Sequence, residues 1–421
     1  MQKINHRILT VADQLLLSAL GFATSIAIVK LGDIEQLGIY GAFMAVVTLV
    51  QTSYSSVVSG QMLLVISGRS DRLKDTYFRL TEIIWLFYSA AAIIVTMVLS
   101  YTVSLVSDGA QAKTFFCAGL CAIAISIFEQ HRKLLYVKRH FLTSTVLTCV
   151  FLTVHLLVSF YLISKSSLYY SAKDAFTSLT VAYLVTALLN PVALKTIKSG
   201  KKIGIRKIGW LHRRYLSQGK YAFGGLSLAW LQNQSISLYF LIIFGPTVTG
   251  LFNLGRLITM PIMVINTGLI NGVLPTLRML GVSKNLLKLA ETTKKYAVYS
   301  LVLNLIYVAV VIIALRVDWV INLQEDLSAA KNYIYFWLML TTGIVWRTWV
   351  TQFLIANLKF RILLKFNMIS AFVTFAGFIL FYLLGFSPLA IACVMFVGEL
   401  VNYALVKAEQ NRLLRTEARN V

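Results

Sequence analysis

The sequence predicts an all-α, polytopic membrane protein with about twelve transmembrane helices in two parallel six-helix lobes. Three observations predict it. Hydrophobic residues make up 58% of the 421-residue chain, and its mean hydropathy is +0.76. The apolar residues gather in about twelve runs, each near the ~20 residues that an α-helix needs to cross a ~30 Å hydrocarbon core. The basic residues concentrate between alternate pairs of these runs.

The expected spans follow from the apolar runs in chain order. The first begins after a short basic start, and Asp13-Gln14 interrupts its apolar run, which continues to Val29. This pattern favours an uncleaved helix over a signal peptide. The second and eighth runs are long enough to tilt or bend. The twelve expected spans are 8–29, 38–66, 80–104, 113–130, 141–164, 176–194, 221–244, 250–276, 296–315, 333–356, 366–385 and 387–406.

A basic segment between the sixth and seventh spans divides the chain. We expect an N-terminal six-helix lobe over 1–194, a basic cytoplasmic linker over 195–220, and a C-terminal six-helix lobe with a short cytoplasmic tail over 221–421. The linker mixes lysines and arginines with isoleucines, which suits either an amphipathic element on the anionic leaflet or a charged linker that only sets topology. An even number of spans per lobe makes any internal repeat parallel. Similar stretches open the second and eighth spans, Leu37-Gly38-Ile39-Tyr40 and Thr249-Gly250-Leu251-Phe252.

The distribution of charge predicts the orientation. With residue 1 in the cytoplasm, 31 of the 39 Lys and Arg residues lie on that side, six lie opposite, and Arg256 and Arg347 lie inside spans. This is the positive-inside rule, and together with the apolar composition it predicts a polytopic inner-membrane protein with both termini in the cytoplasm. The net charge of +23 does not indicate nucleic-acid binding, because no base-reading module accompanies it. Anionic membrane lipids are the expected partners of these loops.

The two arginines inside spans are the first candidates for binding a substrate. A charge at the bilayer centre costs about 2.5–3.5 kcal/mol on insertion scales, so such residues face a cavity or a partner. Arg256 shares one face of the eighth span with Asn253 and Asn266, which predicts a polar stripe along that helix. Guanidinium groups suit phosphates and carboxylates, so both arginines would meet an anionic headgroup. The alternative is a structural ion pair, with Glu399 as the acid.

Other polar residues in the spans are candidates for coupling or binding. Asp13 and Glu399 are carboxylates that could bind and release a proton, although Asp13 would lie in the headgroup region under the simpler interpretation. Glu82 and Glu129 lie at span ends, where we expect them to reach toward water. The polar run 232–235 requires helix-to-helix hydrogen bonds, and within it we expect Gln234 to face the cavity.

Catalytic and cofactor motifs are missing from the sequence. There are no paired carboxylates in an aqueous loop, no HExxH or GxSxG, and no phosphate-cradling glycine-rich loop. The four cysteines form no CxxC pair and all fall within spans. We therefore expect no enzyme activity, no metal and no cofactor. Transport, coupled to an ion gradient or driven by substrate supply, fits better than chemistry.

Three stretches resemble the polysaccharide-export flippases, the O-antigen or capsule repeat-unit (Wzx-like) translocases of the MATE-like MOP superfamily. Asp13–Phe22 (DQLLLSALGF) resembles their opening helix, and Gln36–Phe43 (QLGIYGAF) resembles the turn into their second span. The region from Trp230 to Leu277 resembles the start of their second lobe. The resemblance covers nearly the whole chain in layout. Many such proteins carry an acidic residue near Ser235 or Ser237, which this chain lacks.

The resemblance implies two six-helix lobes around a central cavity and an undecaprenyl-diphosphate-linked oligosaccharide as substrate. The substrate would move from the cytoplasmic to the periplasmic leaflet by alternating access, with other glycan-assembly membrane proteins as further partners. Spans seven and eight would supply polar groups that hydrogen-bond the glycan, among them Gln234, Asn253 and Asn266, and Arg256 and Arg347 would meet the diphosphate or an acidic sugar. The alternatives are a multidrug or cation antiporter of the same superfamily, a membrane-embedded O-antigen ligase or polymerase, and a non-transporting scaffold.

Overall fold

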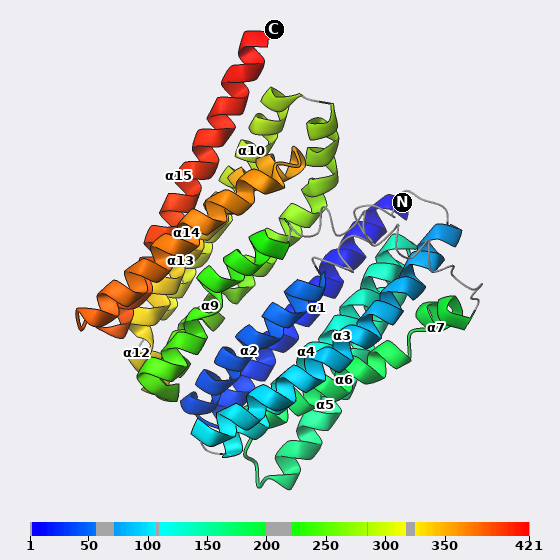
Figure 1. Ribbon diagram of the computed structural model, residues 1–421, viewed down its shortest axis with the longest axis vertical. Helices are drawn as coiled ribbons and strands as arrows, with labels where there is room; N and C mark the ends of the chain where they lie inside the picture. Colours follow the sequence, from blue (N-terminus) through cyan, green and yellow to red (C-terminus); the bar gives the residue numbers. More distant parts are fainter. Residues whose placement is uncertain are drawn as a thin grey trace. The chain divides into compact units, whose positions relative to one another are not determined.

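A computed structural model describes residues 2–55, 71–106, 109–198, 221, 223–283, 285–316 and 325–420. These residues form α-helices joined by short turns, and a helical stretch over 223–233 precedes α9 (Figure 1). The predicted linker lies outside the described residues from 199 onward, as does the part of the predicted second span from 56 onward. The helices are α1 (Gln2–Leu31), α2 (Ile34–Tyr54), α3 (Asp71–Val106), α4 (Gly109–Val137), α5 (Phe141–Lys165), α6 (Ala172–Leu188), α7 (Pro191–Lys198), α9 (Ile236–Val282), α10 (Leu286–Ala314), α12 (Glu325–Ala329), α13 (Lys331–Ala356), α14 (Phe360–Leu383) and α15 (Pro388–Asn420).

The chain divides into two compact units, Met1–Ser227 (unit 1) and Leu228–Val421 (unit 2). In unit 1, α4 is the interior helix, and it packs against α2, α3 and α6, while α5 packs against α1 and α6. The apolar window of α4 is 72% buried, whereas that of α3 is only 6% buried. The side chains of α3 are therefore apolar and exposed, as expected of a helix that faces lipid.

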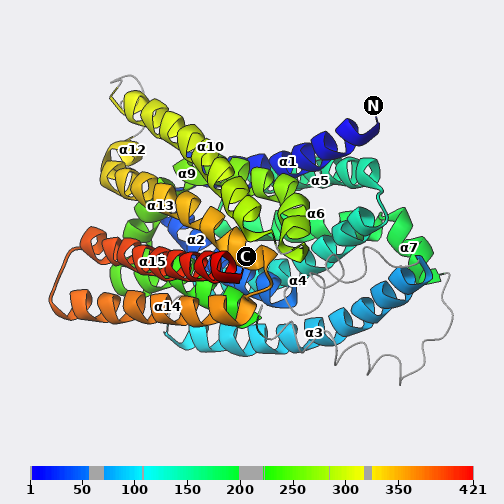
Figure 2. The ribbon, with the colours of Figure 1, turned by 90° about the horizontal axis from the view of Figure 1, so that it is seen from above.

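Unit 2 repeats this pattern of helix contacts around α13. That helix packs against α9, α10 and α15, and α14 lies beside α15 (Figure 2). An aromatic cluster, which includes Phe240, Phe252 and Trp337, fills the interface between α9 and α13. The Nε1 of Trp337 donates a hydrogen bond of 2.9 Å to the carbonyl oxygen of Phe252, which satisfies the indole inside the core.

Eight helices in the described part of the chain are long and apolar enough to cross a membrane. One of the eight, Phe223–Ile270, is 48 residues long and contains a kink at Gly245, where φ is 80° and ψ is 177°. Only glycine adopts these angles readily, and the kink lies between the seventh and eighth predicted spans. The shorter or more polar helices α1, α6 and α13 occupy other positions where spans were predicted.

The sixth predicted span, 176–194, is wrong at its end, because α6 stops at Leu188 and α7 starts at Pro191. The residue before a proline avoids the helical region, and Pro191 itself is favourable at the first position of a helix. The side chain of Asn190 caps the new helix, since its Oδ1 accepts hydrogen bonds of 3.1 Å from the backbone N–H groups of Val192 and Ala193.

The α1–α2 and α5–α6 turns of unit 1 are bonded to each other. The backbone N–H of Tyr170 donates to the carbonyl of Leu31 at 3.0 Å, and that of Ala172 donates to Oε1 of Gln36 at 3.0 Å. The hydroxyl of Tyr169 donates to Asp33 at 3.0 Å. Burial, together with this hydrogen bond to Asp33, raises the pKa of Tyr169 to about 12, so the phenol keeps its proton at neutral pH.

Candidate functional site

Arg256 lies on α9 and is half-buried in unit 2. Its guanidinium carbon is 5.7 Å from the centroid of the Trp337 ring on α13, within the range of a cation–π contact. Among the residues that the structure describes, no carboxylate forms an ion pair with Arg256. A guanidinium held on an indole face, with no acid beside it, retains its capacity to bind an anion.

Arg347, by contrast, is already paired. Its Nε lies 2.6 Å from Oε2 of Glu399 on α15, and the two side chains are 15% and 2% exposed. Oε1 of Glu399 accepts a hydrogen bond of 3.4 Å from Gln232, whose own Oε1 accepts one of 2.8 Å from Ser370 on α14. The structure therefore contains the Arg347–Glu399 ion pair that was the alternative to substrate binding by Arg347. Glu399 compensates the charge of Arg347 within unit 2.

In the polar run 232–235, Gln232 is the residue that joins the cluster of Arg347, Glu399 and Ser370. The residue predicted to face a cavity was Gln234. Gln232 is 2% exposed and Gln234 is half-buried. The helix is interrupted by a turn at Gln234 and Ser235, where both backbone N–H groups share the carbonyl of Trp230. The role of Gln234 at a cavity stays a prediction.

Asn253 and Asn266 do not form an open polar stripe with Arg256. Asn253 is 6% exposed, and its Oδ1 accepts a hydrogen bond of 2.9 Å from Ser237. Asn266 is 4% exposed and accepts one of 3.1 Å from Nε1 of Trp349. Asn253 is thus bonded across the kink of α9 and Asn266 to α13, and such internal hydrogen bonds are the usual role of polar residues inside a helical membrane protein. They position α9, and Arg256 remains the more accessible group of the three.

In unit 1, Asp13 is fully buried inside the protein. Its carboxylate accepts hydrogen bonds from Ser144 and from Nη2 of Arg132, both at 3.1 Å, and from Tyr136 and Thr148. Arg132 was counted in a cytoplasmic loop, because the apolar run of the fourth span ends near residue 130. The helix nevertheless continues to Val137 and carries the arginine inside.

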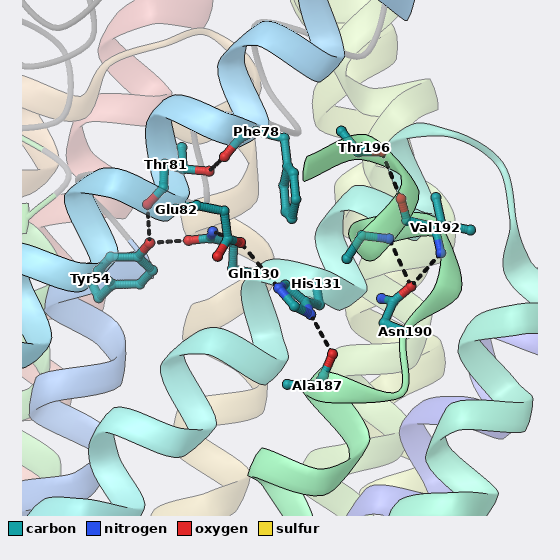
Figure 3. A network of polar contacts seen from close by, with 11 residues as sticks. Tyr54, Phe78, Thr81, Glu82, Gln130, His131, Ala187, Asn190, Val192 and Thr196 are labelled. Carbon is teal, nitrogen blue, oxygen red and sulfur yellow. Dashed lines mark hydrogen bonds and ion pairs between the residues drawn. The ribbon is translucent and has the colours of Figure 1, made fainter. Parts of the chain in front are cut away.

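Glu82 is also not directed toward water as predicted. It accepts a hydrogen bond from Gln130 at 2.5 Å and contacts His131 at 3.1 Å (Figure 3). Glu129 contacts Nη1 of Arg132 at 2.5 Å. One sequence signal could have located these pairs. Glu129, Gln130, His131 and Arg132 follow the apolar run of the fourth span, and no proline or glycine ends the helix there.

A cavity of about 310 Å³ lies in unit 2 between α10, α13 and α15. Its walls include Trp346, Trp349 and Tyr403, with Lys294 and Lys407. None of the seven residues predicted for binding or coupling lines this cavity. Trp346 and Trp349 flank Arg347 in sequence, but the arginine itself points to Glu399.

Comparison with known proteins gives no sequence match. No protein-family model matches the chain. No curated protein matches it either.

Solved structures, in contrast, match over almost the whole chain. The MATE multidrug transporter DinF-BH has a TM-score of 0.69 at 16% identity, over 97% of this chain and 94% of that chain. An outward-facing multidrug resistance MATE family transporter of the MOP superfamily has a TM-score of 0.65 at 15% identity, over 97% and 95%. A MOP superfamily transporter from Pyrococcus furiosus has a TM-score of 0.63 at 13% identity, over 97% and 95%.

These likenesses establish the fold. The chain has the all-helical, multi-pass membrane fold of MATE and MOP superfamily transporters, as the sequence predicted. The match to the transporter from Pyrococcus furiosus is of interest because that protein is described as having a binding pocket of reverse polarity, which suggests a different function. The fold therefore occurs with binding pockets of different polarity.

Proposed function

We propose that this protein translocates a lipid-linked oligosaccharide, joined to its polyprenyl carrier by a diphosphate, across the bacterial inner membrane by alternating access. The MATE-type fold supports a transport function, because its relatives in structure are transporters. The sequence resemblance to repeat-unit flippases supports the substrate class. The expected direction is from the cytoplasmic to the periplasmic leaflet, with both termini in the cytoplasm.

The observation that carries the proposal is the environment of Arg256. The other arginine predicted for substrate binding has a carboxylate at 2.6 Å, but Arg256 has the Trp337 ring and no ion pair among the described residues. A half-buried cation in a membrane helix without an acid is costly to maintain, and a diphosphate or an acidic sugar would compensate it during transport. We assign the first contact with the anionic part of the substrate to Arg256, and a supporting role to Arg347.

The test is a reconstituted flipping assay. Liposomes contain a polyprenyl-diphosphate oligosaccharide, and a membrane-impermeant lectin reports how fast the glycan of the inner leaflet becomes accessible outside. Wild-type protein should accelerate this exchange. Hydrogen bonds to charged groups contribute about 1.5–3 kcal/mol, so Arg256→Gln should slow exchange by about 10- to 100-fold. Arg256→Lys keeps the charge and should lose less.

A cellular experiment complements the liposomes. Deletion of the gene should cause completed repeat units to accumulate on their carrier at the cytoplasmic face, and wild-type protein should clear them. Equal clearance by Arg256→Gln at equal protein level would contradict the role of Arg256. Absence of accumulation after deletion would contradict the proposed function itself.

A second candidate function is a multidrug or cation antiporter. It is favoured by two buried carboxylates in membrane helices, Asp13 at 0% and Glu399 at 2% exposure, and by the multidrug transporters among the structural neighbours. Either carboxylate would then bind the coupling proton or cation. Uptake of a lipophilic cationic dye into acidified vesicles, abolished by Asp13→Asn and indifferent to Arg256→Gln, would favour this function over glycan export.

A further inference from the structure

The cavity of unit 2 has walls of two chemical kinds. It has a volume of about 310 Å³ and lies between α10, α13 and α15, which pack against one another (Figure 2). The side chains of Trp346, Trp349 and Tyr403 form an aromatic wall. Lys294 of α10 and Lys407 of α15 bring ammonium groups to the same cavity. An aromatic wall beside two cations suits a ligand that is both apolar and anionic.

The lining of this cavity carries a net positive charge. Among the lining residues that the structure describes, the two lysines are accompanied by one carboxylate, Glu291, which precedes Lys294 by one turn of α10. The Nζ of Lys407 donates a hydrogen bond of 2.8 Å to Oε1 of the buried Gln410, which anchors the lysine at the cavity wall. An ammonium group has three donors, so Lys407 can keep this bond and still donate to an anion.

Both lysines lie at the level where a membrane holds its phosphates. Lys294 closely precedes the ninth predicted span, 296–315, and Lys407 directly follows the twelfth, 387–406. With both termini in the cytoplasm, as the charge distribution predicts, these two span ends lie at the cytoplasmic face. Tryptophan and tyrosine are enriched at this boundary between the hydrocarbon core and the headgroups. The lipids of the cytoplasmic leaflet include anionic ones, which attract lysines there.

An apolar strip continues from the cavity along α10. The face of α10 that carries Lys294 continues with Val298 one turn later, Val302 two turns later, and then Leu305. All three side chains are exposed. A lipid whose headgroup lies at Lys294 would place its acyl chains along this strip.

We propose that the cavity binds an anionic phospholipid of the cytoplasmic leaflet, with its phosphate at Lys294 and Lys407 and its acyl chains along the apolar strip of α10. Small-molecule sites measure about 300–1,000 Å³, so this cavity suits a headgroup better than an oligosaccharide. The backbone N–H of Leu286 on α10 donates to Oε1 of Glu417 on α15 at 3.2 Å, and the bound lipid adds a further connection between these helices. The inference is independent of the substrate of the proposed transport.

Native mass spectrometry of the delipidated full-length protein tests the site, with phosphatidylglycerol as the probe. A titration measures the Kd of the first bound lipid. Phosphatidylcholine with the same acyl chains is the control lipid, and it should bind more weakly because its headgroup has no net negative charge. Equal affinity for the two lipids would overturn the proposal.

Two variants alter the site in different ways. Lys294→Gln combined with Lys407→Gln removes both ammonium groups and should weaken the binding of phosphatidylglycerol by about 10-fold. Ala290→Phe keeps both charges but fills the cavity from α10, and it should also weaken binding. The matched control, Lys359→Gln combined with Lys365→Gln, removes the same charge from exposed positions at the start of α14 and should bind like the wild type.

Three results would overturn the site. An equal loss of binding in the lysine variant and in the α14 control would mean that surface charge alone attracts the lipid. Unchanged binding in Ala290→Phe would place the lipid elsewhere. Displacement of phosphatidylglycerol by an equal concentration of a polyprenyl phosphate would assign the cavity to the carrier lipid.

Thermal unfolding supplies the second readout. A ligand that binds the folded state raises its stability, so phosphatidylglycerol should raise the Tm of the wild type more than that of either cavity variant. Equal Tm values without lipid verify that the variants fold. An equal rise in Tm for all proteins would contradict the proposal. Neither readout involves transport, so failure here leaves the proposed function to its own test.

Discussion

Arg347 of α13 and Glu399 of α15 form an ion pair between two helices, in which each charge compensates the other. A substitution that removes only one partner leaves the other charge in a low-dielectric interior, which costs about 3–5 kcal/mol. Arg347→Ala would leave Glu399, which is 2% exposed, with Gln232 as its remaining donor. We expect this variant to lose about 3 kcal/mol or more, measured by thermal unfolding of the purified protein in detergent.

The matched control removes both charges. Arg347→Met combined with Glu399→Gln leaves no unpaired charge and keeps an amide beside Gln232. Replacing a whole buried ion pair by neutral groups of similar size is often close to neutral in stability. The double variant should therefore be more stable than Arg347→Ala. If the double variant and Arg347→Ala unfold at the same temperature, an unpaired Glu399 is not the cause of the lower stability of Arg347→Ala.

The sequence shows which residues carry buried charge, but not all of their partners. The Arg347–Glu399 pair was foreseen as an alternative because both residues fall inside apolar runs. The Asp13–Arg132 pair was not, because Arg132 follows the end of such a run and lies 119 positions away from Asp13. Hydropathy reports where an apolar run ends, whereas a helix ends where its backbone hydrogen bonds end, and α4 extends beyond its run.

At the scale of the helix, α9 and α13 approach each other at a glycine. A Cβ atom on Gly255 would lie 2.8 Å from the carbonyl carbon and 2.9 Å from the carbonyl oxygen of Tyr333. Both are backbone atoms, which cannot move aside as a flexible side chain does. Close approach of helices at small residues is common in membranes. Here it also brings the Trp337 ring of α13 to the guanidinium of Arg256 on α9.

Gly255→Val should therefore separate the two helices. Overpacking costs about 1–3 kcal/mol, and the displaced Trp337 should change its fluorescence. Gly268→Val is the control, because it lies on the same helix and a Cβ there meets no heavy atom within 4 Å. Thermal unfolding and tryptophan emission of both variants test this. A Gly255→Val protein that matches Gly268→Val in both measurements would contradict the packing.

At the scale of the whole molecule, the distribution of basic residues makes a prediction about topology. With both termini in the cytoplasm, the α5–α6 turn faces the periplasm and the α9–α10 turn faces the cytoplasm. Ser167 and Ser283 are both exposed to solvent in these turns. In a cysteine-free background, Ser167→Cys should react with a membrane-impermeant maleimide in intact spheroplasts. Ser283→Cys should react only after the cells are broken, and the opposite result would invert the orientation.

The sequence was most informative about the whole molecule and least informative about single faces of helices. Apolar runs and charge asymmetry are properties of long segments, and they indicated the polytopic helical class that the structural comparisons establish. The contacts of one residue depend on which neighbouring segment packs against it. Gln232, which was not singled out, donates to Glu399. Asn253 accepts from Ser237 across the kink of α9, and Asn266 accepts from Trp349 of α13, so that the predicted stripe reduced to Arg256.

The bonded turns of unit 1 have a mechanical consequence. At one end of the unit, the α1–α2 and α5–α6 turns are joined by backbone N–H groups and by a phenol that stays protonated. At the other end, α1, α3, α4 and α5 are joined through charged groups, at Asp13 and at Glu82. A helix of unit 1 that shifts at this second end pivots about the joined turns, which serve as the hinge of the unit.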